Sequence, residues 1–557
     1  MIQAPYRFVE ANRFAEEKNE IFYPSWGNYQ GNDIRFDMPY KDSKSGEIKI
    51  TLTAKSPIFV GDFTHKDENK REFFNHKGVY YIPGSSIKGM IRRIVAILSF
   101  SKMSLEDRTL SYRDLNNPSY QIKAMDQNKI FMGWLYKESE KWFIQEVGNV
   151  TKSQCRISYQ QMKEYLEENL VSEIKTKREA YKKYEIIHNH TKLEIQEGTI
   201  VFTGSAGDKK TREFIFPNTL LEIYELTNEQ IQNFKEAYYI GTSNESKDWK
   251  NLWGKKFDEG KKIPVFFQKD SKNKVLHFGL SMLYKLPYEN SIGTLYKKSI
   301  ENYNESYLDC TERIFGYVKE NSALKGRISF SHFKAQGEIK KCQPETLILS
   351  SPRPTFYPFY LQQTPNTLFK NYDDEDAKLS GFKFYVPKHQ IMPSANTSNV
   401  KIKTTITPLE KETKFVGKLR YFNLRKEELG LLLLSLTFLK GEHFYKIGGA
   451  KPYGYGDCHL DLELPTDIKP EDCINAYIDF VKKEFNGKNP KESKSAKDLL
   501  QVSKKIPDDK DLQYLEVKNF AHIKNKNKKN MANPATIKST IQIKKPFHSP
   551  FDSPKNR

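Results

Sequence analysis

The residue types best suited to chemistry lie in residues 80–93 (YYIPGSSIKGMIRR), where an extended run meets the start of a helix. A Pro-Gly pair breaks the run, and Ser85 or Ser86 can cap the helix that follows. Lys88 and Arg92 are four residues apart and share one helical face. Free backbone N–H groups beside two cations form a natural seat for a phosphate. The alternative is a capped amphipathic helix with two solvated cations.

The sequence also limits which phosphate-bearing ligand would bind at this helix start. The segment lacks the Gly-Lys-Ser/Thr ending of a nucleotide-binding loop, so NTP hydrolysis is set aside. A sugar-phosphate backbone is the favoured ligand. A second candidate is residues 446–457 (KIGGAKPYGYGD), which hold a lysine, two tyrosines and several glycines. Glycine lets backbone N–H groups crowd against a phosphate, although a tight hairpin with no ligand has the same composition.

The overall charge agrees with a polyanionic ligand. The chain of 557 residues has 90 Lys and Arg against 70 Asp and Glu, a formal net charge of +20. Such an excess points first to nucleic acid. Aromatic residues make up 13% of the chain, and they can either stack on bases or fill cores.

Cysteine spacing and hydropathy indicate the compartment. The five cysteines have no close pair, so they predict neither a metal knuckle nor a disulfide framework. The N-terminus carries no apolar signal segment, and the most apolar run, residues 429–439, is too short to span a bilayer. We therefore expect a cytoplasmic protein without a membrane partner.

Periodicity predicts an α+β protein. Residues 48–54 alternate as a strand, a helix follows residue 83 to about residue 100, and a buried helix covers 424–439. We expect an irregular N-terminal arm over 1–45 and a first unit over 46–250, with a charged helical insertion at 160–184. A second unit over 251–465 and a basic, largely disordered tail over 466–557 complete the chain.

The order of these motifs resembles the RAMP superfamily of CRISPR-associated proteins. The strand is followed by Ser-Pro-Ile-Phe-Val-Gly-Asp at 56–62, and the helix start at residues 82–92 comes next. Residues 309–316 follow as D-x-x-E-x-x-F-G, then Gly-Arg at 326–327 and the glycine-rich loop. The matches span roughly residues 48–462, and three such motifs in order are more specific than any one of them.

The resemblance implies a ferredoxin-like, RRM-like fold with large insertions and a role as a backbone subunit of a type III effector complex in antiviral defence. The implied partners are CRISPR guide RNA, target RNA and other effector subunits. RNA binding itself needs no cofactor. The implied RNA-binding residues are Ser85, Ser86, Lys88, Arg92, Arg93, Gly448, Gly449, Lys451, Gly454 and Gly456.

The length departs from the family pattern, because a single backbone subunit is about half this size. The chain is therefore either one unit with a very large insertion or two fused units. Strand–helix sets on both sides of a polar seam near residue 250 favour two tandem units, although the sequence has no clear internal repeat.

Some family members cut the target RNA with an aspartate and a divalent metal. Here the loop after the first strand offers Asp67, our preferred catalyst, and Asp62, either of which would hold Mg²⁺ or Mn²⁺ against a phosphate. A solvated charged loop is the simpler reading. A metal-independent ribonuclease that processes guide RNA, and a generic basic RNA-binding protein, remain alternatives.

Overall fold

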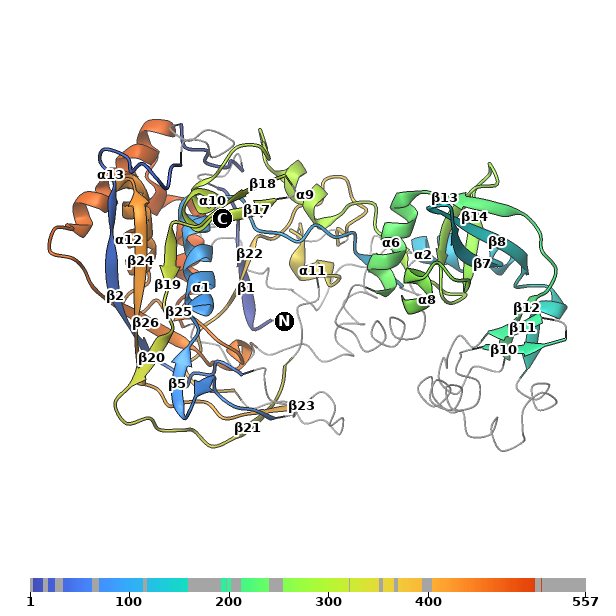
Figure 1. The fold of residues 1–557 in the computed structure, drawn as a ribbon, viewed down its shortest axis with the longest axis horizontal. Coiled ribbons are helices and arrows are strands. Elements are labelled where there is room, and N and C mark those ends of the chain that lie inside the picture. Colours follow the sequence, from blue (N-terminus) through green and yellow to red (C-terminus); the bar gives the residue numbers. More distant parts are fainter. Residues whose placement is uncertain are drawn as a thin grey trace, which may run out of the picture.

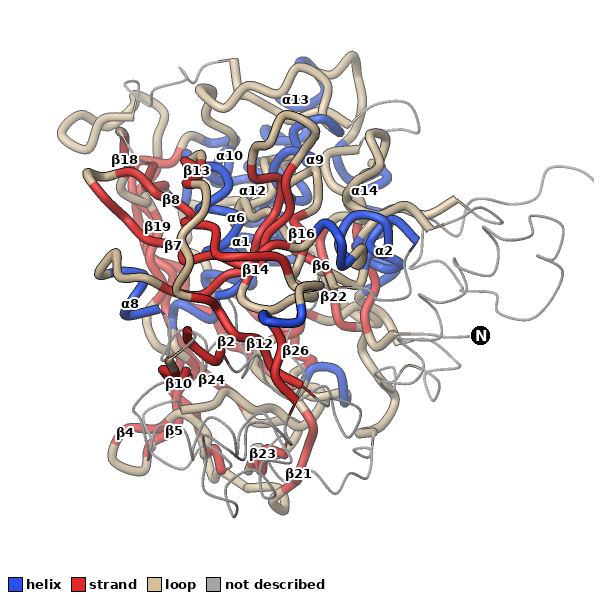
Figure 2. The backbone as a smooth tube through the Cα atoms, turned by 90° about the vertical axis from the view of Figure 1, so that its right-hand side faces the viewer, coloured by secondary structure: helices blue, strands red, loops and turns tan. Residues whose placement is uncertain are grey.

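The computed structural model describes residues 4–13, 19–25, 34–62, 70–113, 118–158, 192–196, 198–201, 212–239, 254–319, 321–349, 354–364, 369–392, 403–505 and 512. Within these residues it has two lobes joined by extended segments (Figure 1). We call the elements built on the largest sheet the main body, and residues 118–279 the second lobe. Figure 2 shows the second lobe from its outer side. The mixed α and β composition predicted from the sequence is confirmed.

The main body is built on an eight-stranded sheet whose order is β25-β26-β2-β24-β20-β5-β4, with β19 also paired to β24. Every pairing in it is antiparallel. The strands come from both ends of the chain: β2 (Lys44–Ala54), β4 (Asn75–His76), β5 (Val79–Ile82), β19 (Ile328–Phe330), β20 (Phe333–Gln336), β24 (Lys414–Leu424), β25 (Tyr445–Lys446) and β26 (Asp457–Glu463).

Helices cover one face of this sheet. α1 (Gly84–Leu98) contacts β19 and α12 (Lys426–Thr437), and α12 contacts β24 and β26. α10 (Cys310–Phe315), α13 (Pro470–Glu484) and α14 (Lys494–Val502) pack around these two helices. The buried side chains of α1 recur at helical spacing, which makes one apolar face toward the core.

The other face of the main sheet is open to solvent. Alternate residues of β24 are buried and exposed, and the exposed set includes Lys418, Arg420 and Phe422. Because successive side chains of a strand point to opposite faces, this alternation places one set in the core and the other in water. The sheet thus offers a half-polar surface on the side away from α1.

The second lobe contains two further sheets. One has the order β13-β8-β7-β14-β15 and the other β10-β11-β12-β9. Its elements are α2 (Pro118–Ala124), β7 (Phe131–Glu138), β8 (Lys141–Asn149), β9 (Arg156–Ser158), β10 (Lys192–Ile195), β11 (Gly198–Val201), β12 (Arg212–Pro217), β13 (Ile223–Leu226), α6 (Asn228–Tyr238), α8 (Lys255–Asp258), β14 (Ile263–Lys269) and β15 (Val275–Gly279).

Short elements join the lobes and close the surface of the main body. β1 (Tyr6–Val9) pairs with β22 (Phe382–Tyr385), β6 (Ser111–Tyr112) with β16 (Leu286–Pro287), and β17 (Tyr317–Lys319) with β18 (Ser322–Leu324). A fourth small sheet contains β3 (Lys70–Arg71), β21 (Glu345–Ile348) and β23 (Lys403–Ile406). The remaining helices are α9 (Ile292–Ser299) and α11 (Tyr357–Tyr360).

Strand pairing crosses the boundary that the sequence suggests near residue 250. β2 lies before this boundary and pairs with β24 and β26 after it, while β7 before it pairs with β14 after it. Neither sheet is therefore divided at the seam. Local periodicity predicts each strand but not its partner, which is why the sequence suggested two separate sets.

The described residues of the predicted arm and tail are more ordered than the sequence suggested. The expected irregular arm contains β1, all of whose residues are buried against β22. The prediction of a largely disordered tail is wrong for residues 466–505, because α13 buries Cys473, Tyr477 and Val481 and α14 buries Leu499 and Val502. These apolar residues recur at helical spacing inside a lysine-rich composition. The predicted helix at 160–184 lies outside the described residues.

Candidate nucleic-acid interface

The first turn of α1 is capped by a residue that lies between two strands far away in the sequence. The cap position is Pro83, and no side chain of the helix caps it, so the prediction that Ser85 or Ser86 does so is wrong. Instead the Gly84 N–H donates to His332 Nδ1 at 3.1 Å. A Cβ on Gly84 would lie 2.2 Å from the Phe330 carbonyl oxygen, so only glycine fits at this helix start.

Lys88 and Arg92 lie along one flank of α1. A Cβ on Gly326 would lie 3.6 Å from Lys88 Nζ, and the Arg92 guanidinium lies 5.9 Å from the centre of the Phe315 ring. Burial and the nearby Arg92 charge both lower the pKa of Lys88. The two cations are therefore close enough to repel each other, as the spacing in the sequence predicts.

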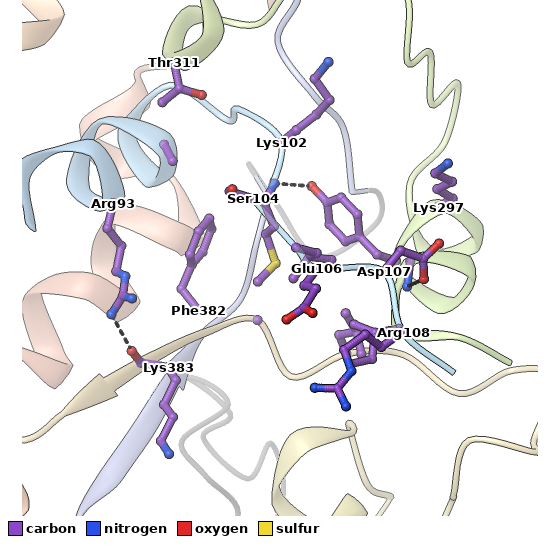
Figure 3. Close-up of a pocket in the computed structure, with 18 of the residues that line it drawn as sticks. Arg93, Lys102, Ser104, Glu106, Asp107, Arg108, Lys297, Thr311, Phe382 and Lys383 are labelled. Carbon is purple, nitrogen blue, oxygen red and sulfur yellow. Dashed lines mark hydrogen bonds between the residues drawn. The ribbon is translucent and has the colours of Figure 1, made fainter. Parts of the chain in front are cut away.

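Arg93 connects the other flank of α1 to two distant segments. Its guanidinium donates to the Lys383 carbonyl at 3.1 Å and lies 5.6 Å from the Phe384 ring (Figure 3). Burial, followed by the Arg93 charge, lowers the pKa of Lys383 to about 8. Burial, Arg93 and Lys446 lower the pKa of Lys451 in the glycine-rich loop to about 8. The helix and the loop thus meet through their cations.

These five cations form what we call the α1 cation cluster: Lys88, Arg92, Arg93, Lys383 and Lys451. No carboxylate of the described residues makes an ion pair with any of them. Their neighbours behave differently: Lys102 Nζ lies 2.7 Å from Glu312, Lys319 Nζ 3.1 Å from Glu312, and Lys297 Nζ 2.8 Å from Glu305. Cations that repel one another and lack acidic partners gain most from an incoming anion.

A cleft of about 930 Å³ opens beside this cluster, where the main body meets the segments leading to the second lobe. Figure 3 shows Arg93 and Lys383 on one side and Lys102, Glu106, Asp107 and Arg108 on the other. Aromatic side chains, among them Phe8, Phe382 and Tyr360, also line it. The cleft therefore combines cations with aromatic faces, the two features that single-stranded nucleic acid requires.

The motif at 309–316 has a structural role. The Asp309 carboxylate accepts from the Glu312 N–H at 2.9 Å and from the Lys102 N–H at 2.9 Å, which caps α10 and fixes the start of the cleft. Arg327 is buried, donates to the Asn423 carbonyl at 2.7 Å and forms a two-pronged ion pair with buried Glu428. This ion pair fastens α12 to the sheet beneath α1.

The glycines of the loop at 446–457 are explained by close packing. Gly448 has a φ of +83°, and a Cβ there would lie 2.1 Å from the Phe59 carbonyl oxygen. The Gly449 and Gly456 N–H groups donate to Phe59 and Pro57 at 2.8 and 2.9 Å. Gly454 and Gly456 are buried, whereas Gly448 and Gly449 are partly exposed. The role of these glycines as RNA contacts stays a prediction.

The predicted catalytic aspartates are placed only in part. Asp67 lies outside the described residues. Asp62 is 9% exposed, and its backbone N–H donates to the Glu72 carbonyl at 3.0 Å. In the described part of the chain no three His, Cys, Asp or Glu side chains converge in a way that could hold a metal ion. The described residues around Asp62 thus do not form a metal site, and we derive no step through one.

Two residues of the interface carry no signal in the sequence. Lys383 lies 290 residues from Arg93 in the chain, and His332 lies 248 residues from Gly84. Lys383 belongs to a short strand without a motif, and His332 lies between two short strands, β19 and β20. The break between β19 and β20 at residues 331–332 is what releases His332 to cap α1. Only the folded arrangement shows these contacts.

Comparison with known proteins gives a family match for part of the chain. The model of the RAMP superfamily matches residues 51–260, which confirms the resemblance for this part of the chain. No curated protein shows a significant match. In the described residues no helix is both long and apolar enough to cross a membrane.

Three solved structures share low similarity with the chain. A type III-B Cmr-beta structure bound to cognate target RNA has a TM-score of 0.20 and 10% identity, covering 76% of this chain and 98% of that chain. A CRISPR RNA-guided surveillance complex has a TM-score of 0.20 and 7% identity, covering 79% and 90%. Csc2 of Thermofilum pendens has a TM-score of 0.14 and 15% identity, covering 55% and 75%. Likenesses this low establish neither fold nor function for this chain.

Proposed function

Because residues 51–260 carry a RAMP superfamily segment, we propose that the protein is a guide RNA-binding backbone subunit of a type III CRISPR interference complex. The observation that carries the proposal is the α1 cation cluster. Its five cations come from three separate segments and have no ion-pair partner among the described carboxylates. The formal net charge of +20 supports the same class of ligand.

The cluster suits a ribose-phosphate backbone better than a single phosphate. Lys88 and Arg92 lie on one flank of α1, and Arg93, Lys383 and Lys451 lie on the other. Successive phosphates passing over the exposed side of α1 would meet both groups. Each phosphate would relieve repulsion between neighbouring cations and form charge-assisted hydrogen bonds.

We further propose one ferredoxin-like unit with a large insertion, in place of two fused units. Along the chain the order is β2, α1, β20, β24, α12 and β26, a βαββαβ pattern. In space the four strands lie in the order β26-β2-β24-β20. The second lobe then enters between α1 and β19. Antiparallel pairing of β2 with both β24 and β26 supports this arrangement.

The proposal is tested by purifying the protein from its own host, extracting the bound nucleic acid and sequencing it. We expect RNA with one repeat-derived end and variable spacers, released by raised salt. Partner subunits should purify with the protein. Heterogeneous RNA would indicate a generic basic RNA-binding protein, and absence of nucleic acid at low salt would reject RNA binding altogether.

Cleavage of the paired target is a separate proposal that rests on the resemblance, with Asp67 and Asp62 as the residues to test. Target RNA cleavage that requires Mg²⁺ or Mn²⁺ and disappears in Asp67→Ala or Asp62→Ala would support it. Cleavage that is unchanged in both variants would reject it, and activity on repeat RNA in EDTA would instead support a guide-processing ribonuclease.

A further inference from the structure

Two exposed aromatic rings lie against each other on the open face of the main sheet. Phe36 and Phe422 are 38% and 39% exposed, and their ring planes differ by 7° with centroids 6.0 Å apart. Phe422 belongs to the exposed set of β24, while Phe36 comes from the segment before β2. Large aromatic side chains left in water in parallel pairs call for an explanation, because burying them is favourable.

The segment that carries Phe36 is held in place by a buried side chain. Asn423 is fully buried, and its amide donates to the Arg35 carbonyl at 2.9 Å. Its side-chain oxygen accepts from the Tyr40 N–H at 2.8 Å. The Arg425 guanidinium also lies 4.0 Å from the Tyr40 ring centre. The backbone on both sides of Phe36 is therefore fixed, and the aromatic pair is pre-organised.

The charges around the two rings favour an anionic partner. Lys325 Nζ lies 5.9 Å from the centre of the Phe36 ring and has no ion-pair partner among the described residues. The Arg420 side chain, two residues before Phe422, is 72% exposed. Its acidic neighbour Glu47 is shared with Lys418, at 2.5 Å from Lys418 and 3.0 Å from Arg420. Cations outnumber carboxylates on this surface.

The aromatic pair is also continuous with the α1 cation cluster. The Phe422 N–H donates to the Arg327 carbonyl at 2.8 Å, so Phe422 lies next to the Gly-Arg turn. A Cβ on Gly326, the first residue of that turn, would lie 3.6 Å from Lys88 Nζ. Lys325 precedes this turn and lies beside the Phe36 ring. The turn therefore borders Lys88 on the α1 side of the sheet and the aromatic pair on the other side.

We propose that Phe36 and Phe422 form a nucleobase-stacking platform for single-stranded RNA, on the face of the sheet opposite α1. The inference rests on the proposed RNA-binding function and adds a second, sequence-tolerant contact to it. A flat aromatic surface accepts any base, and the surrounding cations hold the adjoining phosphates. Duplex RNA keeps its bases stacked internally and gains nothing from the platform.

The test measures binding of a short single-stranded RNA that carries the fluorescent base 2-aminopurine. In the Phe36→Ala/Phe422→Ala variant we expect the dissociation constant to rise roughly 5- to 50-fold, the range for one stacked base. The salt dependence should keep its wild-type slope, because no charge is removed. Stacking on the platform should quench 2-aminopurine in the wild type, and this quenching should disappear in the double variant. Replacing Phe422 by tryptophan in place of alanine (Phe422→Trp) should restore the quenching.

Controls separate the possible failures. Leu276→Ala removes a side chain on the second lobe that is 46% exposed, and it should leave binding unchanged. The single variant Phe36→Ala leaves β24 intact and checks that any loss is not unfolding. If the wild type binds RNA and the double variant binds equally well with the same quenching, the platform is rejected. If the double variant no longer purifies with a partner protein but keeps its RNA affinity, the two rings contact that protein, and the platform is also rejected. Failure of the wild type to bind RNA would reject the proposed function itself.

Discussion

The α1 cation cluster of the main body differs from the ion-paired lysines of the second lobe. In the second lobe, Lys141 lies 2.8 Å from Glu225, Lys261 2.7 Å from Glu259, and Lys269 3.1 Å from Glu146. In the main body, the α1 cation cluster has no such partners among the described residues. Other cations of the main body are paired as well, among them Lys102 with Glu312 and Lys418 with Glu47, so the contrast belongs to the α1 cation cluster and not to the whole lobe. This contrast supports the polyanion site that we propose on α1.

Among the described residues, the main body also buries an ion pair more deeply than the second lobe does. Arg327 and Arg313 side chains are 0% exposed and Glu428 is 2% exposed, whereas the Lys269–Glu146 pair keeps 16% and 8% exposure. A buried ion pair gives little net stability when intact but is costly to break. In the main body, the buried ion pair sets the position of α12, whereas the partly buried cations of the α1 cluster are left without carboxylate partners among the described residues.

The largest effect is expected on stability from Glu428→Ala. Removing the carboxylate breaks the buried ion pair between Arg327 and Glu428, which costs about 3–5 kcal/mol. Urea unfolding monitored by circular dichroism measures it, with Glu225→Ala as the matched control at an exposed pair of the second lobe. A loss of less than about 1 kcal/mol, the size expected for that control, would contradict the buried-pair assignment.

The next effect concerns RNA affinity. Arg92→Ala/Arg93→Ala removes a cation from each flank of α1, and with about 1.5 kcal/mol or more for each charge-assisted contact we expect roughly 100-fold weaker binding. The slope of log affinity against log salt should fall by between about one and two. Fluorescence anisotropy over a salt series measures both quantities.

The control for this pair is Lys141→Ala/Lys261→Ala, which removes the same charge from the second lobe. It should change neither the affinity nor the salt slope. Equal losses in the two variants would mean that RNA responds to net charge alone, and the comparison between the lobes would fail.

The pH dependence of RNA binding gives a smaller effect. Lys383 and Lys451 have pKa values lowered to about 8, so both amines lose their proton as pH rises from 7 to 9. A bound phosphate favours the protonated amine, so affinity should fall by up to about tenfold per amine over this range. Lys383→Arg/Lys451→Arg keeps the charge and should flatten the profile; a wild-type profile as flat as this variant's would contradict the prediction.

Stability of the free protein should change in the opposite direction. In the unfolded chain these amines keep their proton up to the ordinary pKa of 10.5, while in the folded chain they release it near 8. Between these values the unfolded state binds more protons, so the free energy of unfolding rises with pH. Affinity and stability thus move apart over the same pH range.

The sequence predicted the elements of the interface better than their assembly. α1 and α12 follow from apolar residues at helical spacing, and the cations of α1 follow from its amphipathic pattern. The RAMP resemblance was carried by motifs at α1, at 309–316 and at the glycine-rich loop, which lie together in the main body. Each of these helices and motifs is formed by residues close together in the chain, so the sequence pattern alone predicts it.

The rest depends on tertiary pairing. Lys383 joins the cluster because β22 packs beside α1, and nothing in its short strand indicates this. The pairing of β2 with β24 joins segments more than three hundred residues apart, so the sequence suggested two units where the sheet is continuous. The serines at the start of α1 matched a capping pattern, but the helix begins at Gly84, so both serines lie inside its first turn and not at the cap position.

The smallest effect compares how each lobe caps a helix. In the second lobe α6 has a local capping box, in which Thr227 accepts from the Gln230 N–H at 3.2 Å. In the main body α1 depends on His332, which comes from the break between β19 and β20. We expect His332→Ala and Thr227→Ala each to cost about 1 kcal/mol, the usual cost of a lost cap.

The two variants should nevertheless differ in which part of the protein becomes less stable. Loss of Thr227 frays only α6, so amide exchange should rise over the first turn of that helix. Loss of His332 removes the contact between α1 and the break between β19 and β20, so exchange should rise in both. Residues 84–86 carry the first turn beside Lys88, so the same variant should weaken RNA binding slightly, whereas Thr227→Ala should not. If exchange rises only at the start of α1, His332 is a cap and does not couple the helix to the sheet.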